Sequence, residues 1–132
     1  MREQPSAAEL IDAVAEFITR DLAPTLSGRL AFHARVAANV LAIVKRELTL
    51  APDADRADAA RLAMLLRQDG DAAALTEELC RRIAAGEIAA DDPALIEHLW
   101  ATTLATLAVD QPGYATYRRI MADDESQSGS SR

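Results

Sequence analysis

Aromatic residues are scarce in this chain, and so are the residues that mark turns. Only 4% of the 132 residues are aromatic, and glycine and proline occur five times each. Strands are typically rich in aromatic and β-branched residues that alternate with polar ones, and no such long alternation occurs here. The sequence therefore argues against a β-sheet protein. The single cysteine, Cys80, cannot form a disulfide within the chain, which agrees with a reducing compartment.

The chain also lacks a basic surface and long apolar runs. Its formal net charge is −7, whereas nucleic-acid binding needs clustered positive charge. The same acidity disfavours anionic membranes. No apolar stretch approaches the roughly 20 residues of a membrane span, and the first residues lack the apolar core of a signal peptide. We therefore expect a cytoplasmic protein with neither a nucleic-acid nor a membrane partner.

Alanine is what the chain has in abundance. Half of the residues are hydrophobic, and 29 of the 132 are alanine. Alanine loses no side-chain entropy in a helix and lets two helix backbones approach closely. A chain of this length can bury a core without disulfides or metal. These features predict an all-α, single-domain bundle around a central alanine-rich helix.

The boundaries of the expected helices follow from capping and breaking residues. Ser6 and Glu9 form a capping box for a first helix, and Asp71 and Asp92 are suited to cap two later ones. Helices are expected at 6–22, 28–49, 55–68, 71–85 and 92–109, with a loop at 51–53 and a short sixth helix as an alternative. Residues 1–122 would form the bundle, and the polar residues 123–132 a disordered tail.

The segment 28–49 is apolar around most of its circumference and is expected to be the central, most contacted helix. On its helical wheel Arg29, His33, Val36 and Val40 lie within about 40° of one another. His33 is therefore expected inside the core, either bonded to a neighbouring polar group or facing a ligand. In the segment 92–109, by contrast, His98 is expected to be exposed and Trp100 to be buried.

Four residues of this segment are candidates for binding a ligand or a partner: Arg29, His33, Arg35 and Asn39. An anion near the helix start would interact with the free backbone amides and with the Arg29 guanidinium. The alternative is a structural role, with Arg29 in an ion pair and Asn39 in a hydrogen bond between helices. No nucleophile or base accompanies them, so no catalytic residue is predicted.

Metal and cofactor motifs are not recognisable in the sequence. The soft ligands are limited to Cys80, His33 and His98, which makes a zinc site improbable. The acidic pairs at 77–78 and 91–92 lack the spacing of a carboxylate metal cage. No phosphate-binding glycine loop, nucleophile elbow or dinucleotide fingerprint is present. We therefore expect no metal and no cofactor.

One stretch of sequence resembles a known family. The string GRLAFHARVAANVL at 28–41, with PSAAEL at 5–10 and LAVDQP at 107–112, is similar to the signature of a small bacterial all-helical family of unknown function. Genes of that family often neighbour those of acyl-CoA dehydrogenases and of kinases that resemble aminoglycoside phosphotransferases. The resemblance, which covers about residues 5–117, implies an accessory role beside one of these enzymes and assigns no catalytic residue.

These observations lead to one expected function and two alternatives. We expect a non-catalytic interaction module that binds a phosphotransferase-like kinase or an acyl-CoA-handling enzyme. The first alternative is a protein that binds, or an enzyme that acts on, a small anionic molecule in a pocket at Arg29, His33 and Asn39. The second is self-association into a homo-oligomer, which alanine-rich helix faces would allow.

Overall fold

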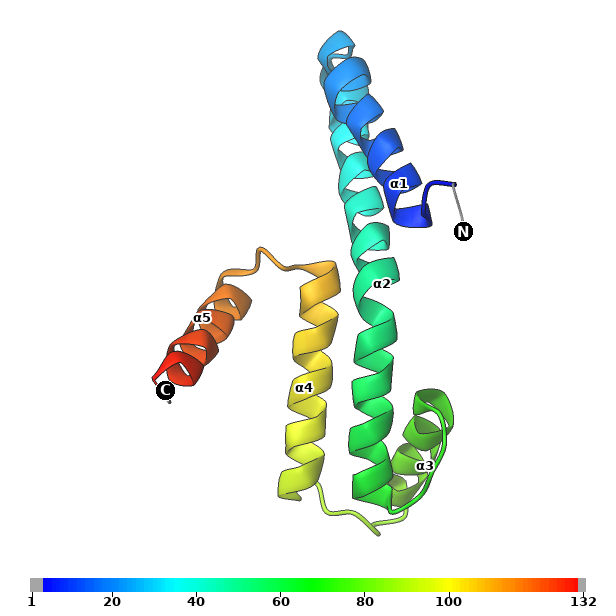
Figure 1. Cartoon of the computed structure of the whole chain (residues 1–132), viewed down its shortest axis with the longest axis vertical. Coiled ribbons are helices and arrows are strands. Elements are labelled where there is room, and N and C mark those ends of the chain that lie inside the picture. Colours follow the sequence, from blue (N-terminus) through cyan, green and yellow to red (C-terminus); the bar gives the residue numbers. More distant parts are fainter. Residues whose placement is uncertain (1–3, 131–132) are drawn as a thin grey trace. The chain divides into compact units, whose positions relative to one another are not determined.

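The structure, a computed structural model, describes residues 4–130, and every regular element in that range is helical. The predicted all-α class is therefore confirmed. The chain divides into two compact units, Met1–Pro52 and Asp53–Arg132. In chain order the elements (Figure 1) are α1 (Ala7–Glu16), the π-helix η1 (Phe17–Leu22), the 3-10 helix η2 (Ala23–Thr25), α2 (Gly28–Leu66), α3 (Ala72–Ala84), α4 (Pro93–Asp110) and α5 (Ala115–Gly129).

Three helices begin where their capping residues predict. At the start of α1 the Ser6 hydroxyl accepts from the Glu9 amide at 3.2 Å, and the Glu9 carboxylate accepts from the Ser6 amide at 2.6 Å. Asp71 accepts from the Ala74 amide at 2.8 Å at the start of α3. Asp92 accepts from the amides of two residues in the first turn of α4. Each carboxylate or hydroxyl satisfies amides that have no partner within the helix.

The prediction of a loop at 51–53 is wrong, because α2 continues through Pro52 to Leu66. Proline in a helix removes one amide donor and crowds the carbonyl four residues earlier. Alanines near Pro52 in the sequence occupy positions 51, 54, 57, 59 and 60. Alanine has the highest helix propensity of all residues. The loss of one hydrogen bond is therefore offset locally, and the two helices predicted on either side of 51–53 form one.

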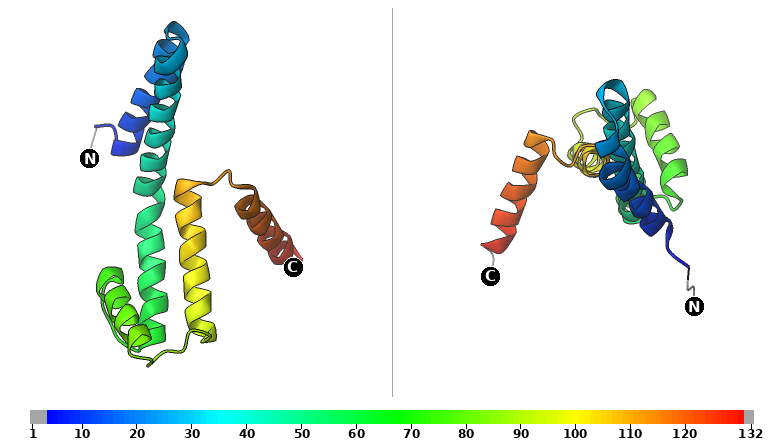
Figure 2. Two further views of the ribbon diagram at one scale, coloured as in Figure 1. Left: turned by 180° about the vertical axis from the view of Figure 1, so that it is seen from behind. Right: turned by 90° about the horizontal axis from the view of Figure 1, so that it is seen from above.

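The first unit contains α1 and residues 28–52 of α2, which run side by side (Figures 1 and 2). Many of the positions that these two helices shield from solvent carry small side chains; the shielded positions include Ala8, Ile11 and Ala15 in α1 and Ala31, Ala34, Ala38, Leu41 and Ala42 in α2. Ala34 is the one buried residue among the described residues of this unit. The helices thus approach largely through alanine, and most of the larger apolar side chains in this part of α2 remain exposed to solvent.

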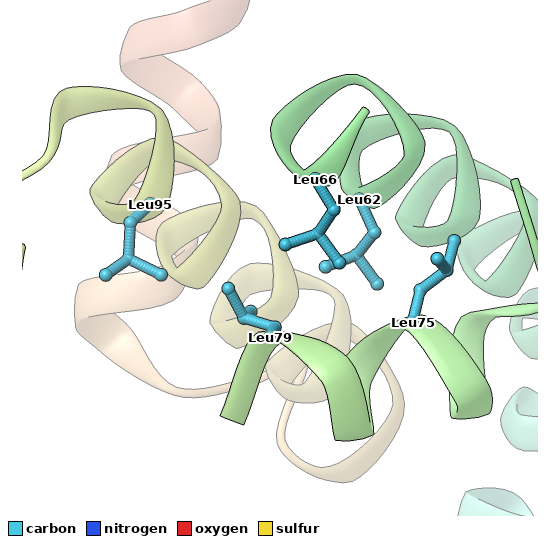
Figure 3. Close-up of a cluster of buried hydrophobic side chains, with 5 residues drawn as sticks. All are labelled: Leu62, Leu66, Leu75, Leu79 and Leu95. Atoms are coloured by element: carbon cyan, nitrogen blue, oxygen red, sulfur yellow. The ribbon is translucent and has the colours of Figure 1, made fainter. Parts of the chain in front are cut away.

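The second unit has a leucine core. Leu62 and Leu66 of α2, Leu75 and Leu79 of α3, and Leu95 of α4 form one buried cluster (Figure 3). The end of α2 is tied to α3, since the Arg82 guanidinium donates to the carbonyl oxygen of Leu66 at 2.9 Å. Three helix segments therefore enclose a core here, whereas the first unit has two.

The C-terminal residues differ from the expected disordered tail. The helix α5 continues to Gly129, although none of its residues is buried. Once a helix has begun, each further residue adds a backbone hydrogen bond, so a polar segment can extend it without a core. The Ser126 hydroxyl also donates to the Ala122 carbonyl oxygen at 3.0 Å. Residues 131 and 132 lie outside the described residues.

Candidate functional site

The four residues predicted as a binding site all lie on α2 in the first unit, and all four are exposed. The Arg29 Nε donates to His33 Nε2 at 3.3 Å, one helical turn away. Arg35 lies about 120° around the helix from Arg29, and Asn39 about 80°, so the four side chains do not converge. A single exposed helix does not enclose the pocket that was expected at Arg29, His33 and Asn39.

The predicted burial of His33 is therefore wrong, and the reason is the choice of contact face. The segment 28–49 has a branched apolar face, which includes Val36 and Val40, and an alanine face on the opposite side. The α1 helix packs on the alanine face, where Ala34 is buried. His33 shares the side of Val36 and Val40, which remains in solvent. The apolar wheel located His33 correctly within that face but did not show which face would be covered.

One flank of the first unit is polar. The Lys45 ammonium of α2 donates to the Asp12 carboxylate of α1 at 2.6 Å. A pocket of about 290 Å³ lies on the same flank and is lined by residues of both helices, including Asp12, Lys45, Arg46 and Thr49. The Asp12–Lys45 contact also shows which residues of the two antiparallel helices lie opposite one another.

The other flank of the first unit is apolar. Asp12 of α1 and Thr49 of α2 mark the polar flank. At about 100° per residue, Leu10, Val14 and Phe17 of α1 point away from Asp12. On α2, Val44 and Leu48 point away from Thr49. The two sets therefore lie on the same flank. We call these five residues the hairpin flank. Each of them is at least 41% exposed.

A second exposed row runs along α2 on the side opposite α1. It consists of Val36 and Val40 at its middle, with Arg29 near its N-terminal end and Glu47 near its C-terminal end; we call these four residues the α2 outer row. Both valines are exposed. No ion pair joins Arg29 or Glu47 to a carboxylate or a cation within residues 4–130.

The second unit contains a buried histidine that the sequence did not predict. His98 of α4 is only 6% exposed, whereas Trp100, expected in the core, is 53% exposed. Both expectations were wrong because α4 is apolar over much of its circumference. The face that packs carries Leu95, His98 and Val109, at helical spacing. That spacing was the available signal, and it includes a polar residue that needs a partner.

Arg61 of α2 is the partner of His98. The Arg61 Nε donates to His98 Nδ1 at 3.4 Å, and the Asp58 carboxylate accepts from the same guanidinium. Since Nδ1 accepts, the hydrogen of the neutral ring is on Nε2. Burial, and then the nearby Arg61 charge, lower the pKa of His98, and the Asp58 charge partly opposes this. The ring is therefore neutral at pH 7.

A pocket of about 310 Å³ adjoins this histidine. Its lining consists of Arg61, Met64, Leu65, Ala94, Glu97 and His98. The His98 Nε2 has no hydrogen-bond partner among the described residues, and it is not sealed from solvent. The pocket thus presents one neutral N–H donor beside an apolar wall of Met64 and Leu65.

The described residues show no centre for metal chemistry. Within positions 4–130, no group of three or more histidine, cysteine, aspartate or glutamate side chains could hold a metal ion. Cys80 is exposed on α3. No helix in this range is both long enough and apolar enough to cross a membrane.

A comparison with known protein families identifies the family of this chain. The model of the domain of unknown function DUF6285 matches residues 24–114, which include all of α2, α3 and α4. The chain belongs to the DUF6285 family. The matched residues contain the string 28–41 and both histidines, whereas α1 and the residues of α5 fall outside them. No significant match is found among curated proteins or among solved structures.

Proposed function

We propose that this DUF6285 protein is a non-catalytic interaction module that binds a partner protein through the hairpin flank. The observation that supports this is the exposure of five large apolar side chains, contributed by two helices, on one side of the first unit. Contiguous apolar surface of this kind marks interaction sites in soluble proteins. The opposite flank carries the Asp12–Lys45 ion pair, so the two flanks of the first unit differ in polarity.

The residues of the hairpin flank suit the interior of an interface. Interface cores are depleted in charge, and helices commonly bind an apolar groove or face through side chains at helical spacing. Leu10, Val14 and Phe17 have that spacing on one helix. A partner helix laid along the flank would cover these three residues together with Val44 and Leu48.

The identity of the partner is suggested by the sequence resemblance. The family that the string 28–41 resembles has bacterial genes beside those of acyl-CoA dehydrogenases and aminoglycoside-phosphotransferase-like kinases. We therefore propose one of these two enzyme classes as the partner, in the cytoplasm of a bacterium. The chain would act on it as an accessory subunit and contribute no catalytic residue.

Binding measurements with both enzyme classes test this function. The full chain is titrated by calorimetry with a purified phosphotransferase-like kinase and with an acyl-CoA dehydrogenase from the same organism. The variant Val14→Lys should weaken binding by about tenfold or more, because it places a charge in the apolar contact. Glu16→Lys, which puts the same side chain about 160° away on the same helix, should bind like the wild type.

Two results would contradict the proposed function. The first is that neither enzyme class binds the chain at micromolar concentrations, and the second is that Val14→Lys binds as strongly as the wild type. Circular dichroism of each variant shows that the helices are intact. Both substituted residues are exposed, so neither variant should change the free energy of unfolding by more than about 0.5 kcal/mol.

The pocket beside His98 favours a second candidate function, the binding of a small molecule. Its ligand would accept a hydrogen bond from His98 Nε2 and place an apolar body against Met64 and Leu65. The Arg61 charge is already balanced by Asp58, and Glu97 is also present, so the pocket does not select for an anion. This differs from the anionic ligand that was expected at Arg29 and His33.

Histidine-detected NMR with a fragment library tests the pocket. Fragments with one carbonyl acceptor and a short aliphatic body should shift the His98 ring resonances and leave those of His33 unchanged. Leu65→Phe, which narrows the pocket, should abolish the shifts. Shifts that persist in Leu65→Phe, or no shift at His98 with any fragment, would refute this candidate.

A further inference from the structure

The α2 outer row has a charge pattern that a second copy of the same chain would complement. Arg29 and Glu47 are 18 residues apart in sequence. That is about five helical turns, so both side chains lie on the same side of α2, about 27 Å apart along its axis. The middle of this interval lies between Val36 and Val40. The row is thus positive near one end, negative near the other and apolar at its centre.

We propose that two copies of the chain associate through the α2 outer row, with their α2 helices antiparallel. A two-fold axis between Val36 and Val40 would place Arg29 of one copy opposite Glu47 of the other, and the reverse. In an interface of this symmetry each pair of contacts occurs twice. Val36 of each copy would pack against Val40 of its partner between the two ion pairs.

The charges select this partner and this orientation. A parallel arrangement would place Arg29 against Arg29 and Glu47 against Glu47, and like charges that face each other across an interface are unfavourable. Between residues 29 and 50, the other charged side chains of α2, Arg35, Lys45 and Arg46, point about 100° or more away from the row. An unrelated partner would have no reason to need opposite charges at equal distances from a central apolar pair.

The burial pattern of the first unit supports a second copy. Among the described residues of this unit one alanine is buried, and the valines of the row are exposed. Since α1 covers the opposite side of α2, the row is open for contact along its length. Two hairpins joined through α2 would bury Val36, Val40 and the already partly buried Ile43 in a core that one hairpin lacks. The two α2 helices would form this core, and α1 of each copy would lie on the far side of its own α2 helix.

Charge reversal tests the pairing directly. Sedimentation velocity of the full chain should show a dimer at micromolar concentration. Arg29→Glu and Glu47→Arg should each weaken the dimer by about tenfold or more, because each puts two like charges opposite each other. The double variant Arg29→Glu/Glu47→Arg should restore the homodimer. An equimolar mixture of the two single variants should form a heterodimer, because every facing pair of side chains at positions 29 and 47 would again have opposite charges.

Controls keep this inference separate from the proposed function. Arg20→Glu reverses a charge on η1 and should leave the dimer intact, which excludes an effect of net charge alone. The inference concerns a different surface from the hairpin flank, so Val14→Lys should dimerise like the wild type whether or not a kinase or dehydrogenase binds. A chain that stays monomeric up to about 100 μM, or a mixture of single variants that does not associate, would overturn it.

Discussion

The two units of this chain use apolar residues in opposite ways. In the second unit, leucines from three helix segments meet in a buried cluster, and Leu62 and Leu75 are completely inaccessible. In the first unit, two helices meet largely through alanines, and most of the leucine, valine and phenylalanine side chains are left exposed. Apolar content is thus a poor guide to burial. The second unit therefore has its own buried core, while the first leaves most of its large apolar side chains exposed.

The largest expected effect comes from truncating a leucine in the second unit. Leu62→Ala should lower the free energy of unfolding by about 2–5 kcal/mol, since it removes a fully buried side chain and leaves a cavity. Val40→Ala, in the exposed row of the first unit, should change it by less than about 1 kcal/mol in a dilute sample. Urea unfolding followed by circular dichroism measures both. Equal losses would contradict the difference between the two units.

A substitution at Pro52, the last residue of the first unit, tests whether α2 is continuous. Pro52→Ala should raise the free energy of unfolding by about 1–2 kcal/mol, because alanine restores an amide donor and removes the crowding within a helix. If residues 51–53 formed a loop, the same change would lower stability by about 0.4–1 kcal/mol through the greater freedom of the unfolded chain. The sign of the change in the urea midpoint distinguishes the two.

Removing a helix cap from each unit should have a smaller effect on stability, and it allows the two units to be compared. Asp92→Ala should lower the free energy of unfolding by about 1 kcal/mol, because α4 carries part of the leucine core and loses two amide contacts. Ser6→Ala should instead increase hydrogen exchange of the α1 amides and leave the main unfolding transition nearly unchanged. A matching loss of global stability in both variants would show that α1 unfolds together with the leucine core.

The smallest effect concerns pH and His98. Its pKa is lowered in the folded protein, so below about pH 6.5 the unfolded chain binds a proton that the folded chain does not. The free energy of unfolding therefore falls as the pH falls below about 6.5, because the unfolded chain gains a proton on His98 first. His98→Gln should reduce the fall in stability between about pH 7 and pH 5, and Arg61→Gln should reduce it less, since burial is the larger cause. Urea titrations at the two pH values measure the difference; identical slopes in all three proteins would refute it.

The sequence correctly predicted the helix starts that depend on nearby capping residues. Ser6, Asp71 and Asp92 begin their helices as predicted, because a cap acts on amides two or three positions away. The prediction of a loop at Pro52 was wrong, because the free-energy cost of one proline in a helix is offset by the helix propensity of about a dozen flanking residues. The polar tail misled the sequence prediction as well, because extending a helix needs no core.

The candidate site was harder to predict, and the two histidines show why. His33 and His98 each lie on a helix with more than one apolar face, and the wheel gave the position of each ring without showing which face would be covered. His33 was expected to be buried and is exposed, and His98 was expected to be exposed and is buried. The partner of His98 lies 37 positions away in sequence, on another helix. No local pattern could have paired it with Arg61.

The sequence by itself determined that the chain is helical, where most of its helices begin, and that it carries the pattern of the DUF6285 family. These properties depend on backbone propensities and on side chains within a few residues of one another. The tertiary structure decided that alanines form the contact between α1 and α2, that leucines enclose the core of the second unit, and that His98 is buried beside Arg61. Those outcomes depend on which of several apolar faces pack together, and that is a competition among contacts distant in sequence.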